Sequence, residues 1–253
     1  MGNLLASKGI DVTMWHRNPS VTRQMNSSRQ HYLVDNLFFM DNITFDDSIG
    51  HVISNASIVV LALPSQKIRN LIKDNKSYFR SDQIIVTLSK GIEMDTLMTV
   101  SDIINEVLNK LSPKVVALSG PSHAEEVVLG HPTALVAASE CVKSAKTVQK
   151  LFAAEMLRTY LNKDIKGVEL GGAMKNVIAI AAGICDGIGY GDNSKAALMT
   201  RGMSEISQLG KAMGAKERTF RGLSGYGDLI VTCLSKHSCP SFLFLLCLLK
   251  HVT

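Results

Sequence analysis

The chain has 253 residues, of which 46% are hydrophobic and 19% charged, and its formal net charge is +5. This composition is that of a folded globular protein and argues against a disordered chain. No long block of like charges occurs, so we expect no nucleic-acid partner, and the mild positive charge favours anionic small molecules as ligands.

The cysteines occur without a CxxC pair, so we expect reduced thiols and a cytoplasmic protein. The N-terminal stretch MGNLLASKG lacks the long apolar core of a signal peptide. The longest apolar run, residues 242–249, is much shorter than the roughly 20 residues needed to cross a bilayer, so we expect no membrane span. No pattern of metal ligands stands out, and we nominate no metal site.

In chain order, residues 4–8 are predicted to form a helix that ends at Gly9, and residues 10–15 a strand followed by a turn. Residues 56–63 form an apolar run with β-branched side chains, as buried parallel strands do. Three further segments have this form: 83–91, 114–122 and 132–139. Helical spacing of apolar residues occurs twice: at 95–111 and at 143–155.

Strands that alternate with helices predict an α/β fold, here a Rossmann-like parallel-sheet domain in residues 1–165. From about Asp164, helical segments rich in Gly and Ala take over, which predicts an all-α domain in residues 166–253. A doubly wound domain usually opens with a strand and a GxGxxG turn, and this sequence contains neither. We therefore expect the first strand to be missing from this sequence, and the helical domain to be incomplete at its end.

One lysine stands in a stretch that is otherwise almost entirely apolar or glycine, GVELGGAMKNVIAIAAG. On a helix, the neighbours of Lys175 are Gly171, Gly172, Ile178 and Ala179, so a ligand could approach the ammonium group closely. The alternative is a lysine that snorkels from a tightly packed helix. Because a desolvated lysine can act as an acid or base near neutral pH, Lys175 is the candidate catalytic residue.

Three further segments place polar groups after a strand or a glycine. Lys90 follows a predicted buried strand, although it could be a simple loop lysine. LSGPSHAEEV places Gly120 and Ser122 at the end of the next strand, where we predict a helix that opens at Ser122 and a capping box completed by Glu125. Helix amides and a serine hydroxyl suit phosphate. Asp228, in GYGDLIVTC, is either a helix N-cap or a site residue.

The end of the second strand of a dinucleotide-binding domain selects the cofactor. An acidic residue there binds the ribose of NAD, whereas a basic residue binds the 2′-phosphate of NADP. Here the chain reads Trp15, His16, Arg17, and no acidic residue follows closely. If a dinucleotide binds, NADP is favoured, unless Arg17 is only a solvated turn residue.

Six motifs carry a family resemblance: DVTMWHRN, VVLALPSQKIR, TLSKGIE, LSGPSHAEEV, GGAMKNVIAIAAGICDGIGYGDNSKAALMTRG and LSGYGDLIVTC. Through them, residues 4–238 resemble the bacterial NAD(P)-dependent glycerol-3-phosphate dehydrogenase family. The resemblance implies a two-domain enzyme that uses NADP or NAD and reduces dihydroxyacetone phosphate to sn-glycerol 3-phosphate, the precursor of phospholipids. A homodimer is left open as its assembly.

The resemblance also implies roles for single residues. Lys175 matches the catalytic lysine, which passes a proton to the carbonyl oxygen as hydride arrives. The substrate-binding positions are matched by Lys90, Gly120, Ser122, Asp228 and Ser238. The cofactor-binding positions are matched by His16, Arg17, Lys90 and Ala124.

Two family features are absent from this sequence. The first is the GxGxxG turn. The second is an Arg-Asn pair after CLSKHS, where this chain reads Cys239 and Pro240 and then an apolar tail. Loss of that guanidinium should remove a charge-assisted contact worth roughly 1.5–3 kcal/mol. We expect the tail to form an exposed apolar patch, the alternative being a terminal amphipathic helix.

Two other functions remain open at this point. A β-hydroxyacid or 6-phosphogluconate-type dehydrogenase also carries a helix-borne lysine after a dinucleotide domain, but GDLIVTC and SGPSHAEE argue against it. A non-catalytic remnant that binds phosphate ligands or a full-length partner is motivated by the missing glycine turn.

Overall fold

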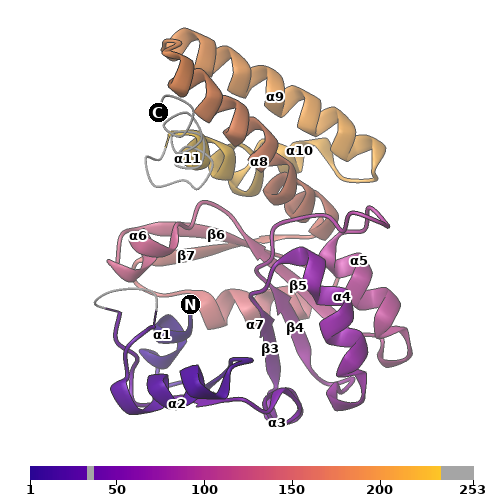
Figure 1. The fold of residues 1–253 in the computed structure, drawn as a ribbon. Helices are drawn as coiled ribbons and strands as arrows, with labels where there is room; N and C mark the ends of the chain where they lie inside the picture. The colour runs from indigo at the N-terminus through magenta and orange to yellow at the C-terminus, as the bar shows by residue number, and fades with distance from the viewer. Residues whose placement is uncertain (33–36, 235–253) are drawn as a thin grey trace.

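The computed structural model describes residues 1–32 and 37–234, and its strands form two sheets (Figure 1). A two-stranded parallel sheet consists of β1 (Val12–Trp15) and β2 (Ile43–Asp46). A five-stranded sheet, in the order β3-β4-β5-β6-β7, consists of β3 (Ile58–Leu61), β4 (Ile84–Thr87), β5 (Lys114–Ser119), β6 (Thr133–Ala138) and β7 (Leu157–Asn162).

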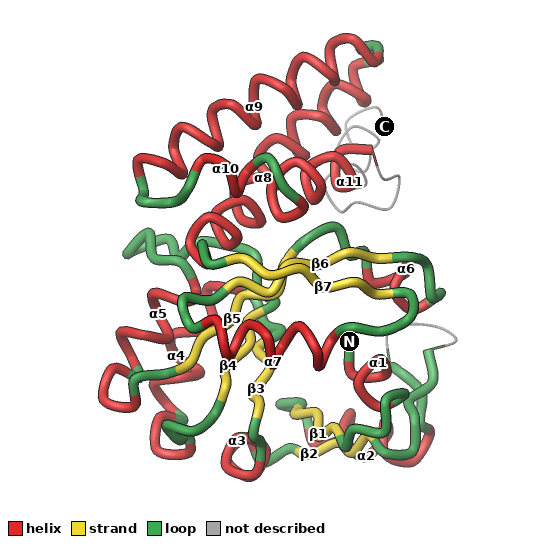
Figure 2. The backbone as a smooth tube through the Cα atoms, turned by 180° about the vertical axis from the view of Figure 1, so that it is seen from behind, coloured by secondary structure: helices red, strands yellow, loops and turns green. Residues whose placement is uncertain are grey.

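Helices accompany these strands and then form a separate helical part, which lies above the five-stranded sheet in Figures 1 and 2. The helices among the strands are α1 (Gly2–Ala6), α2 (Pro19–Ser28), α3 (Ile49–Asn55), α4 (Ser65–Asp74), α5 (Val100–Val107), α6 (Ala124–Val128) and α7 (Val142–Phe152), with short 3-10 turns η1 (Lys76–Tyr78) and η2 (Asn109–Leu111). The helical part consists of α8 (Ile165–Ile188), α9 (Asp192–Ala212), α10 (Glu217–Phe220), the π-helix η3 (Leu223–Gly227) and α11 (Asp228–Leu234).

The predicted α/β fold followed by a helical part is confirmed, with one difference in the sheet. β3, β4 and β5 are parallel, but β6 runs antiparallel to β5. The connection between them holds only the five-residue helix α6, in place of the longer crossover helix that usually joins parallel strands. The chain therefore turns back at the end of β5. β7, which the sequence analysis did not predict, lies at the sheet edge and alternates buried and exposed residues.

The five-stranded sheet is covered on both faces by apolar side chains. On one face, α4 and α5 contribute Ile68, Ile72, Ile103 and Ile104, all fully buried. On the other face, α7 contributes Phe152, which packs in the same cluster as the central strand residues. Burial on both faces explains why the central strands read as continuous apolar runs.

Two predicted helix starts are wrong by a few residues. The helix predicted over 95–111 begins at Val100, because Thr99 and Asp102 form a capping box there. The helix predicted to open at Ser122 begins at Ala124 with His123 as its N-cap and without a capping box. The Ser122 hydroxyl instead donates to the carbonyl oxygen of Gly120 at 3.2 Å, one residue before the N-cap.

α8 is the helix that connects the two parts of the molecule. Its N-cap, Asp164, accepts from the backbone N of Gly167 at 3.0 Å and from the Thr219 hydroxyl at 2.6 Å, which ties α8 to α10. Among the described residues, α8 alone is long and apolar enough to cross a membrane, but 56% of its most apolar 18-residue window is buried inside the protein. Its apolar character is explained by this packing: Leu170 and Ala179, for example, lie in the core of the helical part.

Candidate active site

Residues from four segments meet where the helical part packs against the sheet. Lys90 lies in the loop after β4, and Gly120 follows β5 directly. β4 and β5 are parallel neighbours, so their carboxyl ends place these two segments side by side. Lys175 stands in α8, which packs against β5, and Asp228 is the first residue of α11.

Asp228 binds both lysines at once. Its Oδ1 accepts a hydrogen bond from Lys175 Nζ at 2.5 Å, and its Oδ2 accepts one from Lys90 Nζ at 2.6 Å. Lys90 Nζ also donates to the carbonyl oxygen of Gly120 at 3.2 Å. The side chains of Asp228 and Lys175 are 2% and 7% exposed, whereas that of Lys90 is 26% exposed. Solvent or a ligand therefore reaches the cluster at Lys90, and two ammonium groups share one carboxylate.

The amine of Lys175 has two hydrogen-bond partners and a lowered pKa. Besides Asp228, it donates to the Thr232 hydroxyl at 2.7 Å, and that hydroxyl donates to the Asp228 backbone carbonyl at 2.6 Å. Burial, and secondarily the charge of Lys90, lower the pKa of Lys175 from 10.5 to about 8, although Asp228 opposes this shift. A snorkelling lysine is excluded, because the residue is 6% exposed.

The position of Asp228 depends on a close contact between two backbones. At Gly171 of α8, an added Cβ would lie 2.6 Å from the carbonyl oxygen of Ser224 in η3. Only a glycine lets α8 approach η3 this closely. Because η3 runs directly into α11, this contact fixes where the Asp228 carboxylate points.

The space beside the small neighbours of Lys175 is occupied by the protein itself. The Cβ of an alanine at Gly172 would meet Ser119 Oγ at 3.1 Å and Lys90 Cγ at 3.4 Å. The expectation that these two glycines leave room for a ligand is therefore wrong for the space that their side chains would occupy, because other parts of the protein fill it. Their absence of side chains lets η3 and Lys90 approach α8.

Gly120 has a conformation that only glycine adopts without strain. Its φ is +142°, and an added Cβ would lie 2.9 Å from the carbonyl oxygen of Ala134. The turn at Gly120 points its own carbonyl oxygen at both Lys90 and Ser122. Ser122 thus lies beside the lysine cluster.

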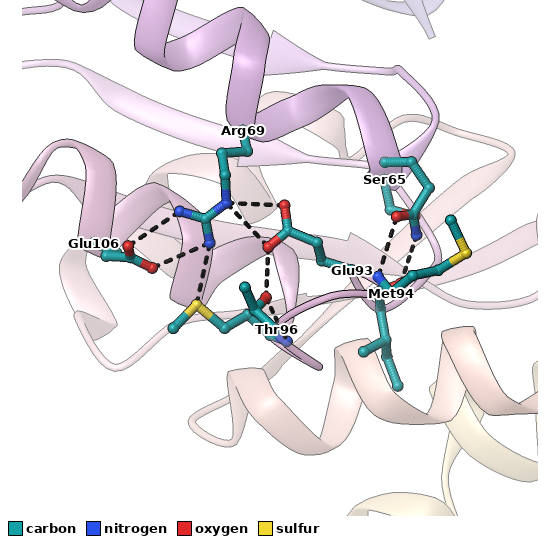
Figure 3. Close-up of polar contacts among 9 residues, drawn as sticks. Ser65, Arg69, Glu93, Met94, Thr96 and Glu106 are labelled. Carbon is teal, nitrogen blue, oxygen red and sulfur yellow. Dashed lines mark hydrogen bonds and ion pairs between the residues drawn. The ribbon is translucent and has the colours of Figure 1, made fainter.

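The loop that carries Lys90 is held by a network of charged groups (Figure 3). Arg69 of α4 donates from Nε to both carboxylate oxygens of Glu93, at 2.9 and 3.0 Å. Its two terminal nitrogens donate to Glu106 of α5, each at 3.1 Å. The Gln66 side chain bonds to the backbone on both sides of Glu93, at 2.7 and 3.1 Å. Arg69 also holds the pKa of Glu93 below its usual range, so the ion pair persists over a wide pH range.

The remaining predicted site residues lie elsewhere or cannot be placed. Ala124 is the exposed first residue of α6. His16 and Arg17 follow β1 in the two-stranded sheet, where His16 Nε2 lies 3.4 Å from the Tyr32 hydroxyl. Ser238 and the apolar tail lie outside the described residues.

Sequence reasoning missed Thr232, although its spacing gave a signal. It stands four residues after Asp228, and residues four apart share one face of a helix. Within residues 1–32 and 37–234, no group of three or more His, Cys, Asp or Glu side chains is arranged to hold a metal ion.

A Rossmann-like sheet followed by a helical part, with a buried lysine between them, defines the class of protein: a two-domain dinucleotide-dependent dehydrogenase. Residues 1–145 match the family model for the NAD-dependent glycerol-3-phosphate dehydrogenase N-terminus, and residues 164–239 match the model for its C-terminus. The chain belongs to the NAD-dependent glycerol-3-phosphate dehydrogenase family, whose members use NAD or NADP.

Similar proteins agree with this assignment. A glycerol-3-phosphate dehydrogenase [NAD(P)+] of Clostridium perfringens (strain SM101 / Type A) is 52% identical over 94% of this chain and 72% of the relative. That of Chlorobium phaeobacteroides (strain BS1) is 48% identical over 93% of this chain and 71% of the relative. The crystal structure of glycerol-3-phosphate dehydrogenase from Coxiella burnetii has a TM-score of 0.90 at 29% identity, over 95% of this chain and 73% of that one. The alternative of a β-hydroxyacid-type dehydrogenase is set aside.

Proposed function

We propose that the chain reduces dihydroxyacetone phosphate to sn-glycerol 3-phosphate with NADPH or NADH, and that the product serves phospholipid synthesis. The family assignment supports the reaction. The observation that carries the mechanism is the buried cluster in which Asp228 holds Lys175 and Lys90.

In this mechanism, Lys175 is the proton donor. Its pKa of about 8 means that the amine is mostly protonated near neutral pH, yet gives up its proton more readily than an ordinary lysine. As the ketone carbon accepts hydride, the carbonyl oxygen gains negative charge and takes the proton from Lys175 Nζ. Asp228 and Thr232 orient the amine during this transfer, and solvent then restores the proton.

Lys90 and Ser122 are proposed to bind the substrate. Lys90 is the exposed member of the cluster, and the cluster carries one more positive than negative charge. A phosphate group is therefore attracted to this opening. Gly120 contributes by turning the chain so that both side chains lie together.

His16 and Arg17 are proposed to bind the adenosine end of the cofactor. Ala124 is proposed to bind the cofactor as well, and Lys90 to contact both the cofactor and the substrate. The groups present fit the 2′-phosphate of NADP: a guanidinium and an imidazole follow β1. The acidic side chain at the end of the paired strand, Asp46, already bonds to His51 at 2.5 Å and to a backbone N at 2.7 Å. When bound, the nicotinamide supplies the hydride.

The test is replacement of the proton donor. Lys175→Ala should abolish turnover of dihydroxyacetone phosphate, followed by NADPH oxidation, while calorimetry shows NADPH affinity near that of the wild type. Lys166→Ala, which removes an exposed lysine of the same helix, is the matched control. Normal kcat in Lys175→Ala would contradict the assigned role. No turnover by the wild-type chain and no heat at millimolar NADPH would instead support the non-catalytic alternative.

We also propose that the protein is cytoplasmic and forms a homodimer. The free thiols of Cys141, Cys185 and Cys233 suit a reducing compartment. On α8, Val177 and Ile180 are 67% and 50% exposed, which offers a second copy an apolar surface. Light scattering of the purified chain would give its mass in solution, and a monomer would contradict the dimer.

A further inference from the structure

α8 and the loop that carries Lys90 are joined at a second place, apart from Asp228. Glu169 stands on α8, six residues before Lys175, and is 6% exposed. Both oxygens of its carboxylate bond to one residue, Ser101. Oε1 accepts from the Ser101 backbone N at 2.9 Å, and Oε2 accepts from the Ser101 hydroxyl.

Ser101 marks the end of the loop whose beginning carries Lys90. The loop follows β4 and ends at Thr99, which caps α5, and Ser101 lies in the first turn of that helix. The Thr99 and Ser101 hydroxyls lie 3.2 Å apart, so the cap and the carboxylate form one hydrogen-bonded group. Since the Arg69 network holds the middle of the loop (Figure 3), Glu169 connects its far end to α8.

Burying a carboxylate at this position costs folding free energy. Burial raises the pKa of Glu169 to about 7, in spite of the hydrogen bonds from Ser101. An apolar side chain of similar size would fill the same volume without that cost. The carboxylate adds directional contacts, because it accepts two hydrogen bonds from a single residue. These bonds fix the position of α8 along its axis and its rotation about that axis, relative to α5.

The same two helices share a second, exposed contact. Lys166 Nζ lies 3.3 Å from Asp102 Oδ2, and these side chains are 39% and 36% exposed. Exposed pairs of this kind contribute little to stability. The buried contact of Glu169 is therefore the one that defines how α8 sits on α5.

We propose that Glu169 is a positioning residue that sets α8 against the Lys90 loop and thereby places Lys175 relative to Lys90 and Asp228. An α-helix is stiff, and six residues span about 9 Å, so a shift of α8 at Glu169 is carried to Lys175. The inference rests on the proposed function only for its effect on turnover. The position of the Lys175 amine can be measured without catalysis.

The test is the reactivity of Lys175 toward acetic anhydride as a function of pH, read by mass spectrometry on the whole chain. Only the neutral amine reacts, so the midpoint reports the pKa of Lys175, about 8 in the wild type. Glu169→Met keeps the length of the side chain but removes both acceptors. We expect its Lys175 to react about fivefold more slowly at pH 8, because an upward pKa shift of about one unit lowers the neutral fraction of the amine from about one half to about one tenth. The midpoint should move upward toward that of an ordinary lysine.

Two further variants separate positioning from folding. Glu169→Gln can still accept from the Ser101 backbone N, so its Lys175 should react within about twofold of the wild type. Lys166→Ala is the control on the same helix pair and should have no effect. If Glu169→Met does not melt cooperatively, Ser101→Ala, which removes only the hydroxyl, should still raise the midpoint and lower the reactivity at pH 8.

Unchanged reactivity and midpoint in a folded Glu169→Met or Ser101→Ala protein would overturn the proposal. Altered reactivity combined with full turnover in Lys175→Ala would instead refute the proposed function and leave the positioning role intact.

Discussion

Replacing Gly171 by Ala tests whether α8 and η3 hold Asp228 through direct backbone contact. The added Cβ would lie 2.6 Å from the Ser224 carbonyl oxygen, whereas ordinary contact begins at 3.4 Å. The two backbones must therefore separate by the difference, about 0.8 Å. Such overpacking costs roughly 1–3 kcal/mol, and the higher helix propensity of Ala offsets about 1 kcal/mol of it. The net loss of stability should be small.

The loss of activity in Gly171→Ala should be much larger, because η3 leads directly into Asp228. A misplacement of about 1 Å at a reacting group can lower the rate roughly 10²-fold. We expect kcat for dihydroxyacetone phosphate to fall by about this factor, while the midpoint of urea unfolding changes little. Gly191→Ala, whose Cβ meets nothing within 4 Å, is the control. Wild-type kcat in Gly171→Ala would refute the rigid coupling between this contact and the carboxylate.

Three further predictions concern titratable groups. The kcat of ketone reduction should fall as pH rises through about 8, where Lys175 loses its proton, and alcohol oxidation should accelerate over the same range; pH profiles in both directions check this. Asp228→Asn removes the attraction that keeps Lys175 protonated, so the midpoint should move to lower pH, and an upward shift would speak against the assigned pairing. Because the pKa of Glu169 is raised from 4.5 to about 7 in the folded state, its stabilising contribution is complete below pH 4.5 and is lost as pH rises through about 7. Over this range the free energy of urea unfolding of the wild type should fall by about 3 kcal/mol, whereas that of Glu169→Gln should not. An equal pH dependence in both proteins would contradict the buried titration.

The centre of the site could be predicted because its residues follow local patterns. Lys90 and Gly120 stand at the ends of parallel strands, and such ends meet at one edge of a sheet. Lys175 is conspicuous as a charge in an apolar helix, and Asp228 as an acid after two glycines. In each case a short stretch of sequence determines both the element and the position of the polar group in it.

The remaining features depend on contacts between distant segments, which a local pattern does not encode. Glu169 and Ser101 are 68 residues apart, and neither stretch indicates the other. β7 lies at the sheet edge with one face exposed, so it lacks the continuous apolar run by which the central strands were predicted. Ser122 has the residue type of an N-cap, but α6 begins at Ala124 with His123 as its N-cap. Local propensity predicts which elements a segment can form, and contacts between distant segments determine which of them forms and where it begins.

The π-helix η3, which directly precedes Asp228, limits which insertions and deletions the chain can tolerate before α11. A π-helix closes its hydrogen bonds one residue further along than an α-helix does, so Leu223–Gly227 holds an extra residue relative to α spacing. Deleting one residue there would restore the α-helical register and rotate everything after it by about 100°. A different side chain would then face the two lysines, so insertions and deletions in this stretch should disable proton transfer even when every chemically important residue is retained.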